Sequence, residues 1–198
     1  MQIKRGRKRD DSVRISILSA ILTLIEEGTN FARINVEQLA RQANVSKTTI
    51  YKWWPNKEAI FCEAFFIYAG KTLPILEYDA DNPQDFYAQF ILRTLEMRRF
   101  HRTAIARVMV GLATEHPDIA QQLHEKHEQP RYQAMQRIFE TWFIAHSSKE
   151  EITFFLKMSF SLIYNFSAVY SDEDVVALIR QLFRTVFPHY AELDLNHP

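Results

Sequence analysis

Residues 35–54 read NVEQLARQANVSKTTIYKWW and decide how the chain folds around them. At about 100° per residue, the apolar side chains of the first half fall on one narrow helical face. Asn35 stands where a helix N-cap belongs, and Ser46 takes the same position before the second half. Asn44 separates the halves, and after Gly it is the residue most often found in the left-handed conformation of a sharp turn. The stretch therefore predicts two short helices joined by a tight turn.

The second predicted helix turns two large side chains inward and a polar, basic surface outward. Ile50 and Trp54 point toward the first helix, so we expect them to be structural. A helix of this width fits the major groove of B-DNA, where its N-terminal residues meet base edges. The side chains expected near bases are Lys47, Thr48, Thr49 and Lys52. The alternative is a generic helical hairpin inside a bundle, because many helices have a cap and one apolar face.

The residues that follow extend this pattern. Residues 43–61, ANVSKTTIYKWWPNKEAIF, resemble the DNA-binding domain of TetR-type transcriptional regulators. That family typically shows a turn residue, Val-Ser, an apolar-aromatic pair, an aromatic residue at the helix end and a Lys soon after. Asn44 replaces the more usual Gly, and Thr48 stands where many members have Gly, which should change the base contacts. The resemblance covers about the first third of the chain.

The resemblance implies a transcriptional regulator, most often a repressor, that binds double-stranded DNA as a homodimer at a near-palindromic operator. Together with the outward helical angles, it implies phosphate contacts from Tyr51, Trp53 and Lys57. It also implies that a small molecule binds in the body of the protein and releases DNA. The alternative function is a helical interaction module whose basic head binds a protein or an anionic surface without sequence-specific DNA binding.

Composition and charge agree with a helical, DNA-reading chain. Gly is scarce, at 4 of 198 residues, and no alternating polar and apolar strands stand out, which favours an all-α protein. Residues 1–57 hold 11 Lys+Arg against 5 Asp+Glu, a net +6, whereas residues 58–198 hold 13 against 19, a net −6. A basic head on an acidic body fits a protein whose head meets phosphates and whose body avoids them.

The first residues are the most basic part of the chain, with five cations within residues 4–9. Because this segment has little to bury, we expect residues 1–10 to be a disordered basic arm. Arg5 and Arg7 are expected at phosphates, with insertion into a narrow A·T-rich minor groove as a further option.

The rest of the chain divides into two predicted domains. We expect residues 11–57 to form the helix-turn-helix DNA-binding domain and residues 58–198 to form a helical ligand-sensing and dimerisation domain. An almost wholly apolar helix near residues 59–69 would link them. Pro130 should kink or divide the helix that begins at Pro117. Further helices are predicted at residues 11–27, 83–99, 101–115, 131–145, 149–170 and 172–187.

The last two predicted helices carry more apolar surface than one bundle face needs. Each begins with a capping box, Ser148 with Glu151 and Ser171 with Asp174. Excess apolar surface suggests an isologous interface, and the TetR resemblance implies a four-helix dimer interface built from these helices. We expect the interface to use Phe155, Leu162, Phe166, Leu178, Leu182 and Val186. The alternative is that both helices only complete the monomer core.

The body is rich in Phe, with 15 in the chain, and these residues could line a cavity for a small apolar effector or simply form the core. The candidate lining residues are Met97, Arg107, Met109, Phe155, Met158 and Tyr164.

Other kinds of chemistry have little support in the sequence. His124 and His127 are three apart on a predicted helix, but no third metal ligand is fixed by spacing, so we expect no metal and no cofactor. No Gly-rich phosphate loop and no nucleophile signature exists, so we expect no enzyme. The basic N-terminus lacks the apolar part of a signal peptide, and no run of about 18 apolar residues occurs. We therefore expect a cytoplasmic protein without a membrane segment.

Overall fold

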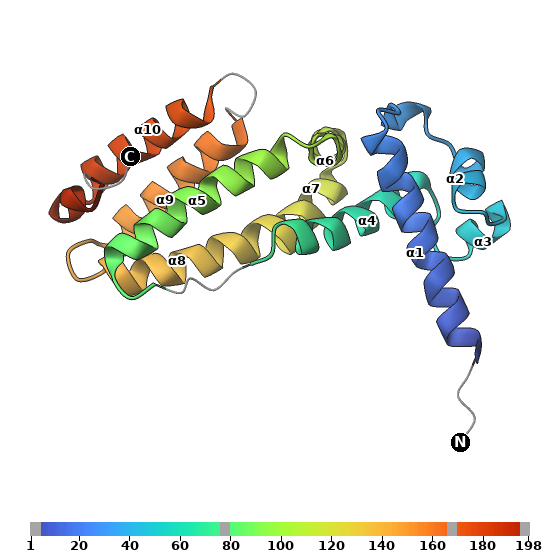
Figure 1. Ribbon diagram of the computed structural model, residues 1–198, viewed down its shortest axis with the longest axis horizontal. Coiled ribbons are helices and arrows are strands. Elements are labelled where there is room, and N and C mark those ends of the chain that lie inside the picture. Colours follow the sequence, from blue (N-terminus) through green and yellow to red (C-terminus); the bar gives the residue numbers. More distant parts are fainter. Residues whose placement is uncertain (1–4, 76–79, 166–169, 195–198) are drawn as a thin grey trace. The chain divides into compact units, whose positions relative to one another are not determined.

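The computed structural model describes the backbone of residues 5–75, 80–165 and 170–194, and every regular element in these ranges is helical (Figure 1). The all-α class predicted from the sequence is therefore confirmed. By its internal contacts the chain forms two compact units. The first combines Met1–Lys71 with Ala104–Gln121, and the second combines Thr72–Thr103 with Gln122–Pro198. Among the helices of the described ranges, none has both the length and the apolar run needed to cross a bilayer.

The first unit is built on helix α1, which packs against α2 and α6, while α2 packs against α3. Its core is aliphatic and aromatic, and Ile17, Ile21, Leu39, Ile50 and Phe61 are all fully buried. The elements of this unit are α1 (Arg5–Glu26), η1 (Phe31–Arg33), α2 (Val36–Gln42), α3 (Lys47–Tyr51), α4 (Lys57–Thr72), α6 (Ala104–Glu115) and the start of α7 (Pro117–Leu123).

Helix α1 begins at Arg5, inside the segment that we expected to be a disordered arm. The structure thus gives residues 5–10 a helical backbone, while residues 1–4 lie outside the described residues. Lys and Arg are good helix formers, and extending an existing helix is far easier than starting a new one. The helix closes as predicted with Gly28, whose φ of 87° is the left-handed conformation of a helix end.

The second unit is a bundle in which α9 packs against α5, α8 and α10 (Figure 1). Its elements are α5 (Pro83–His101), η2 (His124–Glu128), α8 (Gln129–Phe143), α9 (Lys149–Asn165), α10 (Asp172–Val186) and η3 (Pro188–Asp194). The core is a chain of aromatic rings; Phe139, for example, lies 4.9 Å from Phe86 and 5.3 Å from Phe155 between ring centroids. The fully buried rings are Phe86, Phe90, Phe139, Phe143, Phe155, Phe183 and Phe187.

Local sequence signals set several boundaries in this unit. The capping boxes at Ser148 and Ser171 form as predicted, with both hydroxyls accepting from the backbone N–H three residues later. Pro130 follows the single π turn η2, which separates α7 from α8. Because Pro donates no backbone hydrogen bond, the helix is divided at this place, as the sequence predicted. The predicted helix 149–170 is described as far as Asn165, and residues 166–169 lie outside the description.

Candidate DNA-binding surface and ligand site

The helix-turn-helix has the geometry predicted from residues 35–54. The Asn35 side chain accepts a hydrogen bond from the Gln38 N–H at 2.9 Å, which caps α2. The Ser46 hydroxyl accepts from the Thr49 N–H at 3.1 Å, which caps α3. Between them Asn44 has a φ of 53°, the left-handed conformation that the sharp turn requires.

Two buried side chains fix α3 to the first unit. Ile50 is fully buried and Trp54 is 4% exposed, as expected for structural residues. The indole N–H of Trp54 donates to Glu63 Oε2 at 2.9 Å, and the other oxygen of Glu63 lies 2.5 Å from the Arg14 guanidinium. The end of the recognition segment is thus tied to both α4 and α1, so that its outer face is held in a defined orientation.

The outer face of α3 carries most of the residues expected at bases. Lys47, Thr48 and Lys52 are exposed, and Tyr51 is 55% exposed. Thr49 is less available than expected, because it is half-buried and its hydroxyl lies 2.8 Å from the Ser46 hydroxyl. The surface that faces solvent is therefore short, polar and basic.

Helix α3 is shorter than the predicted recognition helix and ends at Tyr51. Lys52 and Trp53 follow in a turn, where the N–H groups of Trp53 and Trp54 both donate to the Ile50 carbonyl. The Pro55 that follows disfavours helical backbone at the residue before it, which explains the early end. Trp53 is half-buried and meets Trp54 edge-on, with ring centroids 5.5 Å apart.

Lys47 is already bound within the protein. Its ammonium lies 2.6 Å from the Glu37 carboxylate of α2. The hydrogen bond from Lys47 holds the pKa of the Glu37 carboxyl below its usual range, and the same bond raises the pKa of Lys47. Because both side chains are exposed, the pair is weak enough to be exchanged for a DNA contact.

Lys57 has a different role from the expected one at a phosphate. Its ammonium donates to the carbonyl oxygens of Phe31, Ala32 and Ile34 at 2.9, 3.1 and 3.0 Å, and lies 4.8 Å from the centroid of the Phe31 ring. An ammonium has three donors, so these carbonyls use them all. The structure therefore corrects the phosphate assignment of Lys57 to one of holding the loop around η1.

Arg5 and Arg7 lie in the first turns of α1, but their side chains are outside what the structure describes. Their phosphate contacts stay predictions.

The six residues expected to line a ligand cavity are not brought together. Met97 is buried and faces a small cavity, and Tyr164 borders a groove in the same unit. Arg107 and Met109 belong to the first unit, where Arg107 is exposed and Met109 is fully buried. Helical periodicity does not reveal which unit a helix belongs to. Helix α6, which carries Arg107 and Met109, belongs to the first unit.

Phe155 and Met158 are three residues apart on α9, but their side chains face different surroundings. Phe155 is fully buried among other rings, which leaves it no surface for a ligand or for a dimer partner. Both expectations for Phe155 are therefore corrected. Met158 is 42% exposed and lines neither the small cavity nor the groove.

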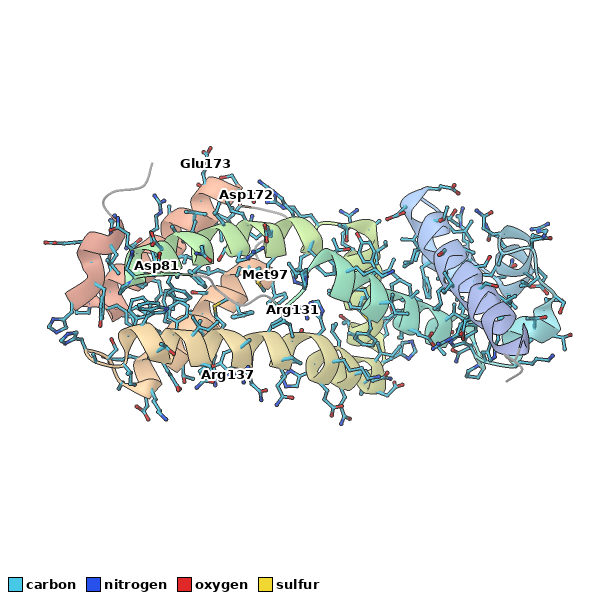
Figure 2. The ribbon with its side chains drawn as sticks, turned by 60° about the horizontal axis from the view of Figure 1, so that its bottom comes forward. Asp81, Met97, Arg131, Arg137, Asp172 and Glu173 are labelled. Carbon is cyan, nitrogen blue, oxygen red and sulfur yellow. The ribbon has the colours of Figure 1, made fainter. Side chains whose placement is uncertain are left out.

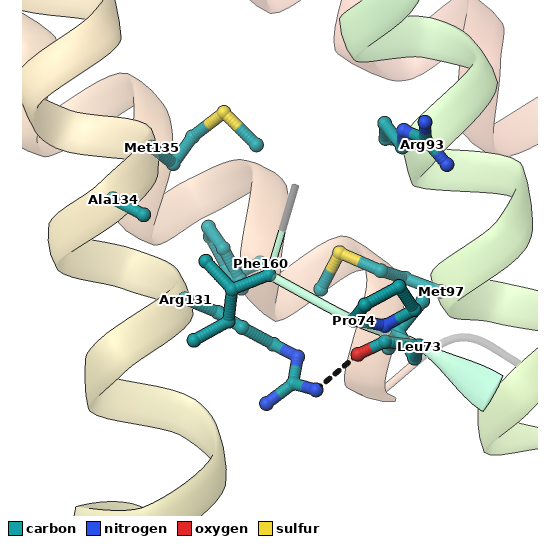
Figure 3. Close-up of a pocket in the computed structure, with 9 residues that line it drawn as sticks. Leu73, Pro74, Arg93, Met97, Arg131, Ala134, Met135 and Phe160 are labelled. Carbon is teal, nitrogen blue, oxygen red and sulfur yellow. Dashed lines mark hydrogen bonds between the residues drawn. The ribbon is translucent and has the colours of Figure 1, made fainter. Parts of the chain in front are cut away.

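The small cavity, about 50 Å³ in volume, lies between residues 73–75, α5, α8 and α9 (Figure 3). Met97, Met135 and Phe160 supply its apolar wall, and the Arg131 guanidinium reaches across it to donate to the Leu73 carbonyl. In Figure 2, Met97 of α5 and Arg131 of α8 point into the space between these helices, whereas Arg137 lies on the outer side of α8.

The residues expected in a dimer interface lie on the surface only in part. Leu178 is 39% exposed, whereas Leu162, Leu182 and Val186 are half-buried. Phe166 lies outside the described residues. Phe154, at 53% exposure, was not expected there, although it lies four residues before Met158 on the same side of α9.

The histidines considered as metal ligands are separated by burial. His127 is 2% exposed, whereas His124 is exposed and lies 3.2 Å from the Glu128 carboxylate. Among the side chains that the structure describes, no three His, Cys, Asp or Glu residues gather as a metal site.

Comparison with known proteins settles which family this geometry belongs to. The sequence profile of the bacterial regulatory proteins of the tetR family matches residues 17–64. YdeS, an uncharacterised HTH-type transcriptional regulator of Bacillus subtilis (strain 168), is 31% identical over 166 residues, which is 83% of this chain and 80% of YdeS. The chain belongs to the tetR family of bacterial regulatory proteins. It is a DNA-binding transcriptional regulator, and the resemblance noted at residues 43–61 is confirmed.

Solved structures of TetR-type regulators share its fold. A putative transcriptional regulator of Streptomyces coelicolor A3(2) matches with a TM-score of 0.63 at 16% identity, over 86% of this chain and 97% of the other. RolR in complex with resorcinol matches with a TM-score of 0.62 at 15% identity, over 96% of each chain. A TetR regulator of Rhodococcus sp. RHA1 matches with a TM-score of 0.53 at 19% identity, over 90% and 97%. At these identities the likeness concerns the fold.

In this TetR-family chain, sequence reasoning missed a set of buried polar residues in the second unit. His127 and Arg131 are four apart along one helical face, which continues with the buried Met135 and Phe139. Two titratable side chains in line with two core residues predict that both face inward. That spacing was the available signal for His127 and Arg131. In the structure Arg131 lines the cavity with Met97, and the His101 ring lies 6.3 Å from the His127 ring and 4.3 Å from the Tyr164 ring.

Proposed function

We propose that this regulator is a homodimeric, ligand-responsive repressor that acts in the cytoplasm on a near-palindromic operator. The observation that carries the proposal is the short helix α3, which exposes Lys47, Thr48 and Tyr51 above the buried Ile50. Two such helices, one from each subunit, enter successive major grooves. In this proposal residues 11–57 bind DNA, and residues 58–198 bind the ligand and form the dimer.

The proposed DNA contacts divide into two groups by the part of the DNA that each would meet. Lys47, Thr48, Thr49 and Lys52 lie near bases, where hydroxyl and ammonium donors read edges in the major groove. Tyr51, Trp53, Arg5 and Arg7 lie at phosphates, which fix the orientation of the protein and make binding depend on salt. Lys47 exchanges its Glu37 partner for DNA, because a pair of exposed charges is held only weakly.

Apolar surface on the last two helices supports the dimer. On α9, Phe154, Met158 and Leu162 recur every four residues, and on α10 Leu178 and Leu182 do the same. Phe154, Met158 and Leu178 expose 53%, 42% and 39% of their surface in the single chain. Stripes of this kind on neighbouring helices suit a self-complementary interface, which a two-fold axis produces.

A ligand in the second unit would release DNA by favouring a body shape in which the two recognition segments no longer match the half-site spacing. This requires that the ligand bind one shape more tightly than the other. The complex of RolR with resorcinol shows a chain of the same fold holding a small aromatic molecule. For the present chain, the cavity beside Met97 supports an apolar effector.

Gel retardation with DNA from the promoter of its own gene tests the proposal. The wild-type protein should give a specific, competitor-resistant complex and a footprint with two-fold symmetry. The double variant Thr48→Ala/Lys52→Ala should lose the specific complex, because it loses two of the base-facing groups while every buried contact stays intact. Two base contacts at about 1–3 kcal/mol each correspond to a loss of about 30-fold or more in affinity.

The matched control is Arg33→Ala, which removes an exposed cation at the end of η1, outside α3. This variant should keep the specific complex. Unchanged specific binding by the double variant would contradict the assignment of α3 as the recognition segment. A protein that binds all DNA equally, without a symmetric footprint, would contradict a specific operator.

A further inference from the structure

The second unit buries several polar atoms that have no hydrogen-bond partner among the described residues. Four of these atoms belong to neighbouring side chains: Arg131 Nε, His101 Nε2, Tyr132 Oη and Tyr164 Oη. Buried polar atoms in folded proteins are nearly always paired, so each exception needs an explanation. Four such atoms in one neighbourhood suggest a site that is completed by another molecule.

The four side chains form one cluster. The His101 ring lies 4.3 Å from the Tyr164 ring and 6.3 Å from the His127 ring, measured between centroids. Tyr132 and Tyr164 border a groove between α8 and α9, and Phe160 lines both this groove and the cavity that Arg131 crosses. Burial is the main cause of the lowered pKa of both His101 and His127, and the charge of Arg131 is the second cause. The Arg131 guanidinium therefore lies close to both rings.

The cluster holds a positive charge without a negative partner. The Arg131 guanidinium donates to the backbone carbonyls of His127, at 2.7 Å, and Leu73, and no carboxylate among the described residues forms an ion pair with it. Glu128 borders the same groove, but its carboxylate lies against His124. Arginine keeps its charge inside proteins, so the guanidinium favours an incoming anion.

The imidazoles add no further positive charge at neutral pH. Burial lowers the pKa of His101 to about 4 and that of His127 to about 3, so both rings are neutral. Burial also raises the pKa of Tyr164 above its ordinary value, so its hydroxyl keeps its proton and can donate it. The cluster therefore offers one cation and two hydroxyl donors.

We infer that this cluster binds the carboxylate of a small organic acid, with Arg131 Nε and the Tyr132 and Tyr164 hydroxyls as donors. The apolar body of the acid lies against Met97, Met135 and Phe160 (Figure 3). The inference rests on the proposed ligand response and names the chemical class of the ligand. A volume of about 50 Å³ is less than a whole ligand needs, so the two flexible methionine side chains turn aside on binding.

Titration calorimetry on the full chain at neutral pH, without DNA, tests the inference. The probes are benzoate, phenylacetate and hexanoate, each compared with its amide, which has nearly the same shape but no charge. At least one acid should bind about tenfold or more tightly than its amide, because charged groups form the stronger hydrogen bonds. Equal binding of each acid and its amide would overturn the inference, and so would the absence of binding by all three acids.

Two variants and a control locate the anion. Arg131→Gln should abolish the preference for acid over amide, whereas Arg137→Gln, on the outer side of the same helix (Figure 2), should leave it unchanged. Tyr164→Phe keeps the ring contact with His101 and should weaken acid binding about fivefold without unfolding the protein. An acid preference that survives both Arg131→Gln and Tyr164→Phe would overturn the assignment.

Retardation of operator DNA is measured separately. If acids bind with the expected preference but DNA is not released, the ligand class stands and the proposed ligand response fails. If the chain binds operator DNA but none of the acids, the DNA-binding proposal stands and the ligand class fails.

Discussion

The ammonium of Lys57 has two candidate tasks, to hold backbone carbonyls or to hold a DNA phosphate. In the structure it performs the first, with Phe31, Ala32 and Ile34 as acceptors. These acceptors precede it by 23 to 26 residues, so the spacing within the motif could not reveal them. Lys57 was assigned to a phosphate from the family resemblance and its outward angle, and neither of these shows a partner so far away in the sequence.

The variant Lys57→Met separates these tasks. It removes three hydrogen bonds from a charged donor and leaves carbonyls in need of partners, so the free energy of unfolding should fall by about 2 kcal/mol in a urea titration. The dependence of DNA affinity on salt should keep its slope. Lys52→Met should do the opposite: unchanged stability, and an operator affinity reduced about tenfold, because its ammonium is proposed to contact bases. A reduced slope with Lys57→Met would restore the phosphate role.

His101 and His127 make the stability of the protein depend on pH. Burial holds their pKa values at about 4 and about 3, below the ordinary value of 6.5. The folded protein therefore keeps both rings neutral at a pH where the unfolded chain already binds protons. Stability is complete above pH 6.5 and falls as the pH drops from there toward the folded-state values.

Denaturant unfolding between pH 8 and pH 5 should show this loss. Each histidine costs about 2 kcal/mol by pH 5, since one pKa unit corresponds to about 1.4 kcal/mol. His101→Gln should remove about half of the pH dependence, and exposed His116→Gln should remove none. If both variants had the same pH dependence as the wild type, other groups would be responsible.

At the scale of the helix, features that depend on a few neighbouring residues were predictable. The caps at Asn35, Ser46 and Ser171 each join a side chain to a backbone N–H three residues later, and a three-residue pattern is visible in sequence. The division of the helix before Pro130 was likewise predictable, because the proline itself causes it. Helix ends without such a signal were not predicted. Helix α1 begins at Arg5, because a helix is easily extended through basic residues when no Pro, Gly or capping residue ends it.

The joint between α5 and α10 could not be predicted locally. Arg98 of α5 is fully buried, and its guanidinium lies 2.9 Å from the Asp172 carboxylate and 2.7 Å from the Tyr170 carbonyl. The Asp172 carboxylate also pairs with the Arg102 guanidinium at 3.0 Å. Arg98 and Asp172 are 74 residues apart in the sequence. The hydrogen bond from Arg98 holds the pKa of Asp172 below its usual range. This clamp fixes the first turn of the helix that carries Leu178.

Arg98→Met should release the start of α10. The variant keeps most of the buried side-chain volume but removes the 2.7 Å hydrogen bond to the Tyr170 carbonyl and the buried partner of the Asp172 carboxylate, so stability should fall by about 2–3 kcal/mol. Asp172→Asn, which keeps a hydrogen-bond acceptor for Arg98 and Arg102, should cost less. Chemical unfolding at one fixed protein concentration makes the comparison, and equal losses in both variants would mean that the carboxylate charge is the main contribution.

At the scale of the whole molecule, the sequence predicted the all-α class and the helix-turn-helix because both follow from short-range periodicity and capping. The proposed ligand site could not be predicted from the sequence. Its residues come from α5, α8 and α9, which the sequence could list as helices but could not pack. Arg107 and Met109 were grouped with Met97 for their types alone, although the chain places their helix in the first unit. Composition identifies side chains that suit a cavity, whereas tertiary contacts choose among them.

The proposed dimer concerns the whole molecule, and it would use surface that one chain leaves exposed. Met158→Glu/Leu178→Glu puts a carboxylate on each of the stripes of α9 and α10, where it stays solvated in a monomer but would be desolvated in an interface. Light scattering at micromolar concentration should give 23.4 kDa for this variant and twice that mass for the wild type. Operator affinity should drop about 100-fold or more, because the two heads are no longer linked. Leu92→Glu, at a residue of α5 with 61% exposure, is the control and should remain a dimer. A wild-type mass of 23.4 kDa, or a dimeric double variant, would contradict this interface.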